Sequence, residues 1–300
     1  MNLPEQIAAQ LLQAGLDPSE VAGVAVGALA EDAAGGDVTS IATIAAEARA
    51  VADFVVRGEG VLAGLPVAEA VLHVATAGDV EILARARDGD LVQRGEVVLT
   101  VSGPTRALLT AERTALNLLC HLSGVATLTA RWVDAIAGTG AAVRDTRKTT
   151  PGLRALEKYA VRCGGGVNHR MSLSDAALVK DNHVVAAGGV VAAFEAVREQ
   201  FPEVPLEVEV DSLGQLGDVL AAGADLILLD NFSVRETADA VRRVAGRARL
   251  ESSGGLTLAV ARDYAATGVD YLAVGALTHS APVLDIAMDL DMAGSRTQEP

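Results

Sequence analysis

Hydrophobic and polar residues follow two different patterns along the first third of the chain. Helical spacing of apolar residues predicts two opening helices, over Pro4–Ala14 and from Pro18 to about Ala30. Between residues 49 and 102 the pattern changes to valine-rich runs separated by glycine-containing turns. It predicts strands at Ala50–Arg57 and Val97–Ser102, with a helix between them. We therefore expect an N-terminal α/β sandwich-like domain with an interface helix over residues 1–125.

The centre of the chain predicts two further helices. Leucines recur at helical spacing over Thr105–Leu119, and Ser123-Gly124 is expected to separate this helix from a second one that ends near Gly138. The stretch 114–130 has no formally charged residue but contains an asparagine, a histidine and hydroxyl groups, so we interpret it as a buried helix pair. The apolar run over 21–30 is too short to span a bilayer, and no targeting segment is expected.

After residue 140 the chain becomes a repeat of strand and helix. Strands are predicted at Ala141–Arg144, Ala177–Lys180, Leu206–Val210, Leu226–Leu229, Arg249–Glu251 and Tyr271–Val274. Helices are predicted at Leu153–Arg162, Val190–Phe201, Leu213–Ala221, Val234–Val244 and Leu256–Ala266. Alternating units of this kind favour parallel strands, and six of them favour a barrel over an open doubly wound sheet. We assign residues 126–300 to a catalytic, open or incomplete β/α (TIM-like) barrel, and allow its final helix or tail to return to the N-terminal domain.

Composition limits the classes of partner. The chain has 300 residues, of which 50% are hydrophobic and 21% charged, so a large core is expected and disorder is excluded as the main state. Its net charge of −15 excludes a general nucleic-acid or membrane-surface binder. Two cysteines, Cys120 and Cys163, make no disulfide framework and fit a reducing, cytoplasmic location. We interpret Cys163, next to three glycines, as a small buried residue rather than a nucleophile.

One window departs from this acidic average. Residues 144–180 hold eight basic and three acidic side chains, which is 8 − 3 = +5. In a β/α barrel the chemistry lies at the carboxyl ends of the strands, and these ends carry polar or glycine residues here. Arginine forks and lysine point charges suit carboxylates and phosphates. The sequence therefore predicts a pocket for a multiply charged anion, with Arg147, Lys148, His169, Arg170 and Lys180 as its candidates.

The remaining strand ends add two kinds of group. Ser253-Gly254-Gly255 and Val274-Gly275-Ala276 follow the last two strands, where small residues either expose amides to a phosphate or simply make tight turns. Glu209 and Asp230 end the two middle strands. They are suited to hold Mg²⁺ and ribose hydroxyls or to stabilise a developing cation, and equally to pair with the lysines. Arg113 lies mid-helix, and a surface ion pair is its ordinary interpretation.

Two other functions fit such a barrel. A Schiff-base aldolase would use Lys148 or Lys180 at a strand end. A non-catalytic barrel would bind a phosphate metabolite without turnover. No GxGxxG follows the first predicted strand of the barrel, which weakens a dinucleotide-binding function.

Several ordered motifs narrow these possibilities. Asp145–Arg154, Gly164–Arg170 and Lys180–His183 resemble the quinolinate phosphoribosyltransferase family, whose members are also called carboxylating nicotinate-nucleotide pyrophosphorylases. The resemblance covers essentially the whole chain and includes Gly36–Ser40, Glu112–Asn117, Glu207–Asp211, Leu229–Phe232, Glu251–Gly255 and Val274–His279. Such a series is far more specific than any one glycine pattern.

The resemblance implies phosphoribosyl transfer from phosphoribosyl pyrophosphate, with Mg²⁺, to quinolinate. Decarboxylation then gives nicotinate mononucleotide, pyrophosphate and CO₂ in de novo NAD biosynthesis. A nicotinate phosphoribosyltransferase of related architecture is the nearest alternative, although a dicarboxylate calls for more cations than a monoacid. Both substrates are polyanions, so the local charge of the cleft matters more than the net charge.

The resemblance also implies a role for each candidate residue. It assigns substrate binding to Arg113, Thr146, Arg147, Lys148, His169, Arg170 and Lys180, and the 5′-phosphate cradle to Ser253, Gly254, Gly255, Val274, Gly275 and Ala276. The implied catalytic residues are Lys148, Lys180, Glu209 and Asp230, the last two near the ribose and its Mg²⁺. In the family, the arginine that matches Arg113 reaches quinolinate across a subunit interface, so a homodimer or hexamer is expected.

Overall fold

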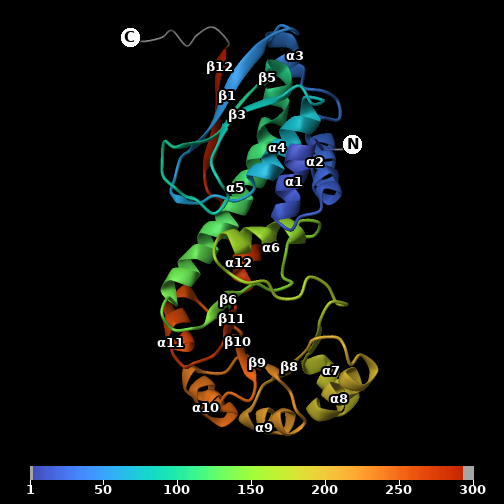
Figure 1. Ribbon diagram of the computed structural model, residues 1–300, viewed down its shortest axis with the longest axis vertical. Coiled ribbons are helices and arrows are strands. Elements are labelled where there is room, and N and C mark those ends of the chain that lie inside the picture. The colour runs from blue at the N-terminus through green and yellow to red at the C-terminus, as the bar shows by residue number, and fades with distance from the viewer. Residues whose placement is uncertain (1–2, 293–300) are drawn as a thin grey trace. The chain divides into compact units, whose positions relative to one another are not determined.

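The computed structural model describes residues 3–292 and divides them into two compact units (Figure 1). The first unit is built from residues 3–128, 150–164 and 280–292, and the second from residues 129–149 and 165–279. Each unit is therefore assembled from segments that are far apart in the sequence. Among the described residues, no helix has both the length and the apolar composition that crossing a membrane requires.

An antiparallel sheet and a set of helices form the first unit. The sheet has the strand order β12-β1-β5-β3, where these strands are Ile286–Met292, Arg49–Val56, Val97–Pro104 and Glu81–Arg85. Its helices include α1 (Glu5–Gln13), α2 (Pro18–Ala33), α3 (Val38–Thr43), α4 (Leu65–Ala75) and α6 (Arg154–Cys163), and two short strands, β2 (Gly60–Val61) and β4 (Leu91–Val92), pair beside the sheet. The strands and opening helices predicted from the sequence are confirmed.

Local sequence explains these elements. The Asp17 carboxylate accepts the amide of Ser19 at 2.7 Å, and Pro18 occupies the first turn of α2, so this helix begins where the sequence predicted. Alternate residues of β1 face the core, and Phe54 among them is fully buried. β12 pairs with β1 in antiparallel register, so a strand from the last part of the chain completes a sheet that begins at residue 49.

The predicted break at Ser123-Gly124 is wrong, because one helix, α5, runs without interruption over Thr105–Ala135. Ser123 lies inside it, and its hydroxyl accepts the amide of Ala63 at 3.0 Å and donates to the Ala63 carbonyl at 3.1 Å. Gly124 allows the backbone at Pro282 to approach, since a Cβ there would lie 2.1 Å from the Pro282 oxygen. Ser123 and Gly124 therefore contact neighbouring loops from within the helix, and they do not form a turn between two helices.

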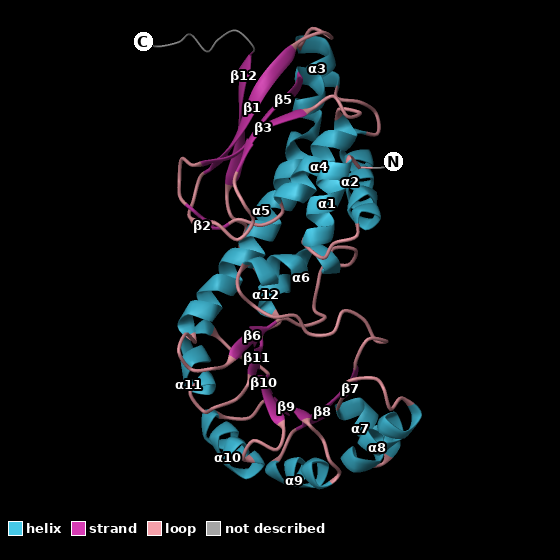
Figure 2. Ribbon diagram, viewed as in Figure 1, coloured by secondary structure: helices cyan, strands magenta, loops and turns pink. Residues whose placement is uncertain are grey.

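Six parallel strands form the second unit. They are β6 (Ala142–Arg144), β7 (Ala177–Val179), β8 (Leu206–Val210), β9 (Leu226–Asp230), β10 (Arg249–Ser253) and β11 (Tyr271–Ala273). The helices are α7 (Asp181–Ala187), α8 (Val190–Gln200), α9 (Leu213–Ala221), α10 (Val234–Val244), a 3₁₀ turn at Leu258–Val260, α11 (Ala261–Ala265) and α12 (Ala276–His279). The strand order β6-β11-β10-β9-β8-β7 follows the chain around a barrel, with β6 and β7 as its open edges (Figure 2). The predicted open β/α barrel is confirmed.

The register of these strands decides which side chains share the inner face. Glu209 pairs with Leu228, and Leu228 pairs with Glu251, so all three point to one side of the sheet. Residues two positions away share that side, which adds Glu207 and Asp230. This face therefore carries carboxylates where barrel interiors usually carry branched apolar side chains.

Candidate active site at the carboxyl ends of the parallel strands

The candidate residues of the second unit lie at the carboxyl ends of its strands. Lys148 follows β6, Lys180 follows β7, and Glu209 lies in the last part of β8. Asp230 and Ser253 are the last residues of β9 and β10. Parallel strands end at the same edge, so the sequence-predicted groups are brought to one rim of the open barrel.

Lys180 and Glu209 form an ion pair on this rim. The Lys180 side chain is 45% exposed, while that of Glu209 is 11% exposed, so the lysine presents its charge to solvent and the carboxylate lies behind it. The Lys180 amide donates to Nδ1 of His183 at 3.0 Å, which holds the turn into α7. Burial and the nearby Glu209 charge raise the pKa of Asp230, although Lys180 opposes that shift.

Two arginines on this rim form no ion pair with an acid among the described residues, although the charges of Glu207 and Asp175 act on Arg170. Nε of Arg147 is buried and has no hydrogen-bond partner among the described residues. Burial and the charge of Arg147 lower the pKa of Arg170, whose guanidinium donates to the Ala176 carbonyl at 2.8 Å. Within residues 3–292 no carboxylate lies at ion-pair distance from either guanidinium. Two like charges held together in this way provide a place for an anion.

Lys148 lies against the turn that follows β11. A Cβ on Gly275 would lie 3.0 Å from Cδ of Lys148 and 3.3 Å from Nε2 of His279, so glycine leaves room for the lysine stem. Thr278 donates its hydroxyl proton to the Lys148 carbonyl at 2.7 Å, and the Lys148 amide donates to Oγ1 of Thr146 at 3.0 Å. The backbone around Lys148 is thereby fixed while its side chain stays exposed.

The turn after β10 requires glycine for a physical reason. Gly254 has φ +93°, and a Cβ there would lie 2.2 Å from Oδ1 and 2.9 Å from the amide nitrogen of Asn231. Asn231 itself has φ +57° and donates from its side chain to Asp230 at 2.7 Å. Gly255 has φ +59° and faces open space, so this turn is tight on one side and open on the other.

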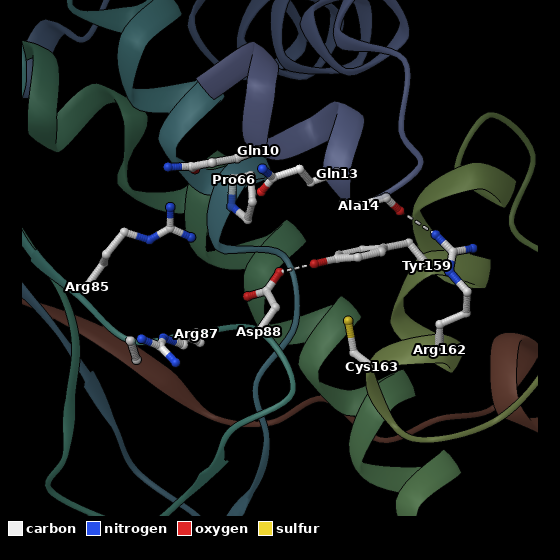
Figure 3. Close-up of a pocket in the computed structure, with 11 residues that line it drawn as sticks. Gln10, Gln13, Ala14, Pro66, Arg85, Arg87, Asp88, Tyr159, Arg162 and Cys163 are labelled. Atoms are coloured by element: carbon white, nitrogen blue, oxygen red, sulfur yellow. Dashed lines mark hydrogen bonds between the residues drawn. The ribbon is translucent and has the colours of Figure 1, made fainter. Parts of the chain in front are cut away.

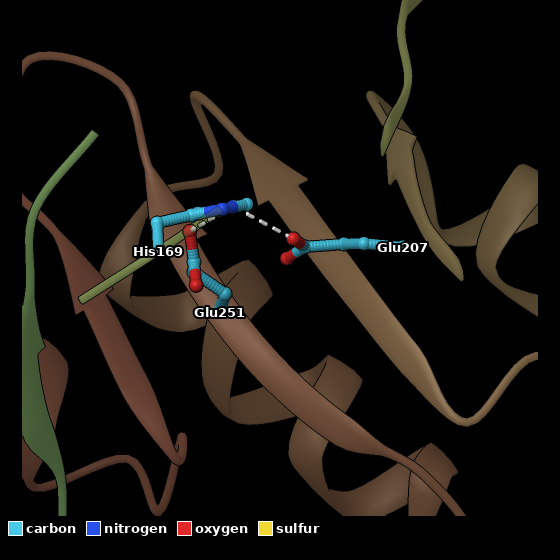
Figure 4. A group of neighbouring side chains, drawn as sticks. All are labelled: His169, Glu207 and Glu251. Carbon is cyan, nitrogen blue, oxygen red and sulfur yellow. Dashed lines mark ion pairs between the residues drawn. The ribbon is translucent and has the colours of Figure 1, made fainter. Parts of the chain in front are cut away.

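A buried cluster of charged groups lies inside the barrel (Figure 4). Nε2 of His169 lies 2.8 Å from Glu207 and 3.8 Å from Glu251, and a guanidinium nitrogen of Arg144 lies 2.6 Å from Glu251. Burial raises the pKa of Glu207 and of Glu251 to about 7, although the charge of Arg144 opposes both shifts. No role for Arg144, Glu207 or Glu251 was predicted from the sequence, although two glutamates spaced by two residues in a buried strand were a usable signal.

Arg113 lies in the first unit. It is an exposed residue of α5, so the second unit by itself does not contain it. The remaining predicted residues, including Val274 and Ala276 beside Gly275, belong to the rim described above.

A separate cavity of about 610 Å³ lies in the first unit (Figure 3). Polar groups that line this cavity form hydrogen bonds with one another. Tyr159 donates to Asp88 at 2.7 Å, and Arg162 donates to the Ala14 carbonyl at 2.5 Å. Burial raises the pKa of the Cys163 thiol to about 11, so this thiol is protonated at neutral pH and is not an activated nucleophile. None of the predicted substrate residues lines this cavity.

Comparisons with known proteins match both parts of the chain. Residues 37–123 match the family profile described as "Quinolinate phosphoribosyl transferase, N-terminal domain", and residues 125–289 match the C-terminal domain of the same family. A "Nicotinate-nucleotide pyrophosphorylase [carboxylating]" of Mycobacterium leprae is 58% identical over 258 residues, which is 85% of this chain and 91% of that protein. A probable protein of the same name from Bacillus subtilis is 39% identical, over 90% of this chain and 93% of its own length.

Solved structures agree with these matches. The crystal structure of NadC from Streptococcus pyogenes superimposes with a TM-score of 0.89 at 42% identity, covering 92% of this chain and 98% of that one. The nicotinate-nucleotide pyrophosphorylase of Francisella tularensis superimposes with a TM-score of 0.87 at 37% identity, covering 91% of this chain and 96% of that one.

Proposed function

The chain belongs to the quinolinate phosphoribosyltransferase family, and from this premise we propose how its residues carry out the reaction. The enzyme transfers the phosphoribosyl group of phosphoribosyl pyrophosphate to quinolinate and releases CO₂ and pyrophosphate. The product, nicotinate mononucleotide, enters de novo NAD biosynthesis. The observation that carries our assignment of residues is the pair of arginines, Arg147 and Arg170, whose charges repel each other and which form no ion pair with an acid in the described part of the chain.

We assign the carboxylates of quinolinate to Arg147, Arg170 and Lys180, with His169 beside them. A planar guanidinium binds a carboxylate through two parallel hydrogen bonds, and a dicarboxylate would neutralise the repulsion that lowers the pKa of Arg170. Lys180 adds an exposed ammonium on the same rim. Thr146 orients this segment through the Lys148 amide.

Phosphoribosyl pyrophosphate is assigned to the other side of the rim. Lys148 lies over Gly275, where its ammonium can bridge the pyridine carboxylate and the sugar phosphate. The 5′-phosphate is assigned to the turns after β10 and β11, at Ser253, Gly254, Gly255, Val274, Gly275 and Ala276. The open space at Gly255 supports this assignment, since an oxygen-rich ligand can approach the backbone there.

The chemical steps need positioning and charge rather than a general base. The pyridine nitrogen uses its lone pair to bond to ribose C1, while the bond from C1 to pyrophosphate breaks and its electrons leave with pyrophosphate. Glu209 and Asp230 face the positive charge that develops on the ribose. The bond between carbon 2 and its carboxylate then breaks and CO₂ leaves. The electron pair stays on carbon 2, where the adjacent pyridinium charge stabilises it, and carbon 2 takes a proton from water.

Glu209 and Asp230 also fit a divalent cation. They end adjacent strands, and the charge of Glu209 is one cause of the raised pKa of Asp230, so a cation between them would remove an unfavourable interaction. When bound, Mg²⁺ would neutralise the pyrophosphate and strengthen it as a leaving group. We assign these two carboxylates as its protein contacts.

Product analysis with two acids tests the proposed function. Purified enzyme is incubated with phosphoribosyl pyrophosphate and either quinolinate labelled in its 2-carboxylate or nicotinate. We expect labelled CO₂ and nicotinate mononucleotide from quinolinate and no product from nicotinate. Conversion of nicotinate with no CO₂ from quinolinate would establish the monoacid enzyme instead, and borohydride trapping of Lys148 or Lys180 with a carbonyl substrate would establish a Schiff-base enzyme.

Self-association completes the proposed site. We propose that Arg113 reaches the quinolinate of a neighbouring copy of the chain, in a homodimer or a larger assembly such as a hexamer. Its exposure on α5 supports this role, because a long arginine on a helix surface is free to enter a partner. We place the reaction in the cytoplasm, which suits the two cysteines that are free in the structure.

A further inference from the structure

Two buried glutamates have no part in the mechanism proposed above. Glu207 is 2% exposed and Glu251 is 0% exposed, and both lie on the inner face of the barrel beneath the rim. Burial of a carboxylate is unfavourable unless a positive charge or hydrogen bonds compensate its lost hydration. Among the described residues, neither oxygen of Glu207 has a hydrogen-bond partner, so nearby positive charge is its compensation. We expect the two carboxylates to attract the basic side chains and hydrogen-bond donors around them.

The first group that they hold is His169. Nδ1 of its ring accepts the amide of Arg170 at 2.7 Å, so that nitrogen carries no proton. The proton of the neutral ring is therefore on Nε2, which lies 2.8 Å from Glu207 and 3.8 Å from Glu251. Figure 4 shows the ring end directed toward both carboxylates. The Arg170 amide thus fixes the tautomer of His169, and the two carboxylates lie around its protonated nitrogen.

The second group is Arg144. One guanidinium nitrogen lies 2.6 Å from Glu251 and 3.9 Å from Glu207, and the guanidinium stacks over the ring of Tyr271 at 4.8 Å. Arg144 is the last residue of β6, three positions before Arg147. Its carbonyl accepts the amide of Val274 at 2.9 Å, so the end of β6 is also tied to the turn after β11.

Backbone contacts join these two groups to the substrate rim. Asp145 accepts the His169 amide at 2.8 Å and the Asn168 side chain at 2.6 Å, so the segment 168–170 is fastened to the end of β6. We propose that Glu207 and Glu251 are positioning residues for quinolinate. They hold His169 and Arg144 from inside the barrel and thereby fix the backbone that presents Arg170 and Arg147. This inference rests on the proposed function, because it assumes that these arginines bind the carboxylates.

A metal ion is the other occupant that this cluster suggests. Ligand atoms of His169, Glu207 and Glu251 all lie within 4.8 Å of one another. Arg144 already supplies a positive charge 2.6 Å from Glu251, which is the role that the ion would have. We therefore favour the ion cluster, and metal analysis of the purified enzyme forms part of the test.

Steady-state kinetics of Glu207→Gln and Glu251→Gln test the proposal. Glutamine keeps the size of the side chain and removes its charge. We expect KM for quinolinate to rise about tenfold or more, because the removed charge no longer holds His169 and Arg144, while KM for phosphoribosyl pyrophosphate changes less than about twofold. Glu69→Gln is the matched control, since Glu69 is 2% exposed and lies 3.2 Å from Arg85, but in the first unit. It should leave both KM values unchanged.

The ring nitrogens of His169 give a second readout that needs no turnover. In wild-type enzyme, ¹⁵N chemical shifts should show the Nε2-protonated tautomer, and both variants should shift the Nε2 resonance because a carboxylate charge beside it is removed. If a glutamine variant does not fold, Glu207→Asp and Glu251→Asp provide shortened carboxylates for the same measurements.

Several results would overturn the proposal. Unchanged KM for quinolinate in an enzyme that makes nicotinate mononucleotide would do so, as would equal increases in both KM values accompanied by a matching loss of thermal stability. One metal ion retained per wild-type chain and lost in Glu207→Gln would replace the ion cluster with a metal site. A wild-type enzyme that makes no nicotinate mononucleotide would instead contradict the proposed function, and the His169 spectrum would still report the positioning.

Discussion

At the scale of single residues, the basic side chains of this chain differ in whether an acidic side chain pairs with them. Lys180 has Glu209, Arg144 has Glu251, and Arg85 has Glu69. Lys148, Arg147 and Arg170 have no ion-pair partner among residues 3–292. A charge that the fold does not use for its own stability is available to a substrate.

Lys148→Ala should therefore affect rate much more than stability. The side chain is exposed and pairs with no acid in the described part of the chain, so we expect the free energy of unfolding to change by less than about 1 kcal/mol. Removal of one preorganised charge should lower kcat/KM by about 10²- to 10³-fold. Urea unfolding and initial rates check the two values, with Arg87→Ala as a control for loss of one exposed arginine. Unchanged turnover would remove Lys148 from the site.

Glu69 should make stability depend on pH. Burial raises its pKa in the folded state from 4.5 to about 7, despite Arg85, so the folded protein binds a proton that the unfolded chain releases between these values. The free energy of unfolding therefore falls as pH rises through this window. Glu69→Gln keeps the neutral form, so its stability relative to wild type should be higher near pH 8 than near pH 5, by up to about 3 kcal/mol.

Urea unfolding of both proteins at the two pH values measures this difference. Other titrating groups, Glu207 and Glu251 among them, are common to both proteins and cancel in the comparison. An identical relative stability at the two pH values would mean that Glu69 is charged in the folded protein throughout.

At the scale of elements, the helices and strands that could be predicted are those whose hydrophobic pattern is local in the sequence. The strand-helix repeat after residue 140 and the start of α2 were found because their signals lie within a few neighbouring residues. The elements that were missed are α3, α7, α12, β2, β3, β4 and β12. β12 carried a signal, since Ile286, Met288 and Leu290 alternate with more polar residues, but its partner β1 begins 230 residues or more earlier, and pairing at that separation has no local sign.

The site was predictable to a different degree. Strand-end positions follow from the fold class, so Lys148, Lys180, Glu209 and Asp230 could be named in advance. Glu207 and Glu251 required the register between β8, β9 and β10, which places them on one face with Glu209. Side-chain periodicity along one strand cannot show which strands are neighbours.

Two helical glycines should respond to alanine in opposite ways. In α2, a Cβ on Gly27 meets nothing within 4 Å, so Gly27→Ala should stabilise the protein by about 0.5–1 kcal/mol through helix propensity alone. In α5, a Cβ on Gly124 would lie 2.1 Å from the Pro282 oxygen. We expect Gly124→Ala to destabilise by about 1–3 kcal/mol. Thermal unfolding of both variants measures this, and a stabilising Gly124→Ala would contradict the close approach of the Pro282 backbone to α5.

At the scale of the whole molecule, the net charge of −15 is an average of two unlike regions. Residues 144–180 carry +5, so the rest carries −15 − 5 = −20. Five of the eight basic side chains of this window, Arg144, Arg147, Lys148, Arg170 and Lys180, lie in the second unit. The acidic remainder repels nucleic acid and anionic membranes, while the basic side chains at the barrel rim attract polyanionic substrates. Substrate affinity should therefore follow local rather than net charge.

Mixing two inactive proteins tests whether the site is shared between subunits. Arg113→Ala and Lys148→Ala should each be inactive alone. In a dimer formed from one copy of each, one site combines an intact Arg113 with an intact Lys148. Random reassociation should therefore restore about a quarter of wild-type activity. A mixture without recovered activity, although sedimentation shows mixed dimers, would place both residues in one chain's site.

The pairing of β12 with β1 determines when one edge of the first sheet can be completed during synthesis of the chain. β1 leaves the ribosome early and has β5 as a neighbour soon afterwards, but its other edge stays open until residues 286–292 have been translated. During that interval the whole barrel is made while an unpaired strand edge of the first unit is exposed, which is a site for pairing with other nascent chains. β12 thus closes a sheet whose other three strands are translated before the barrel, and that edge is protected only once residues 286–292 are available.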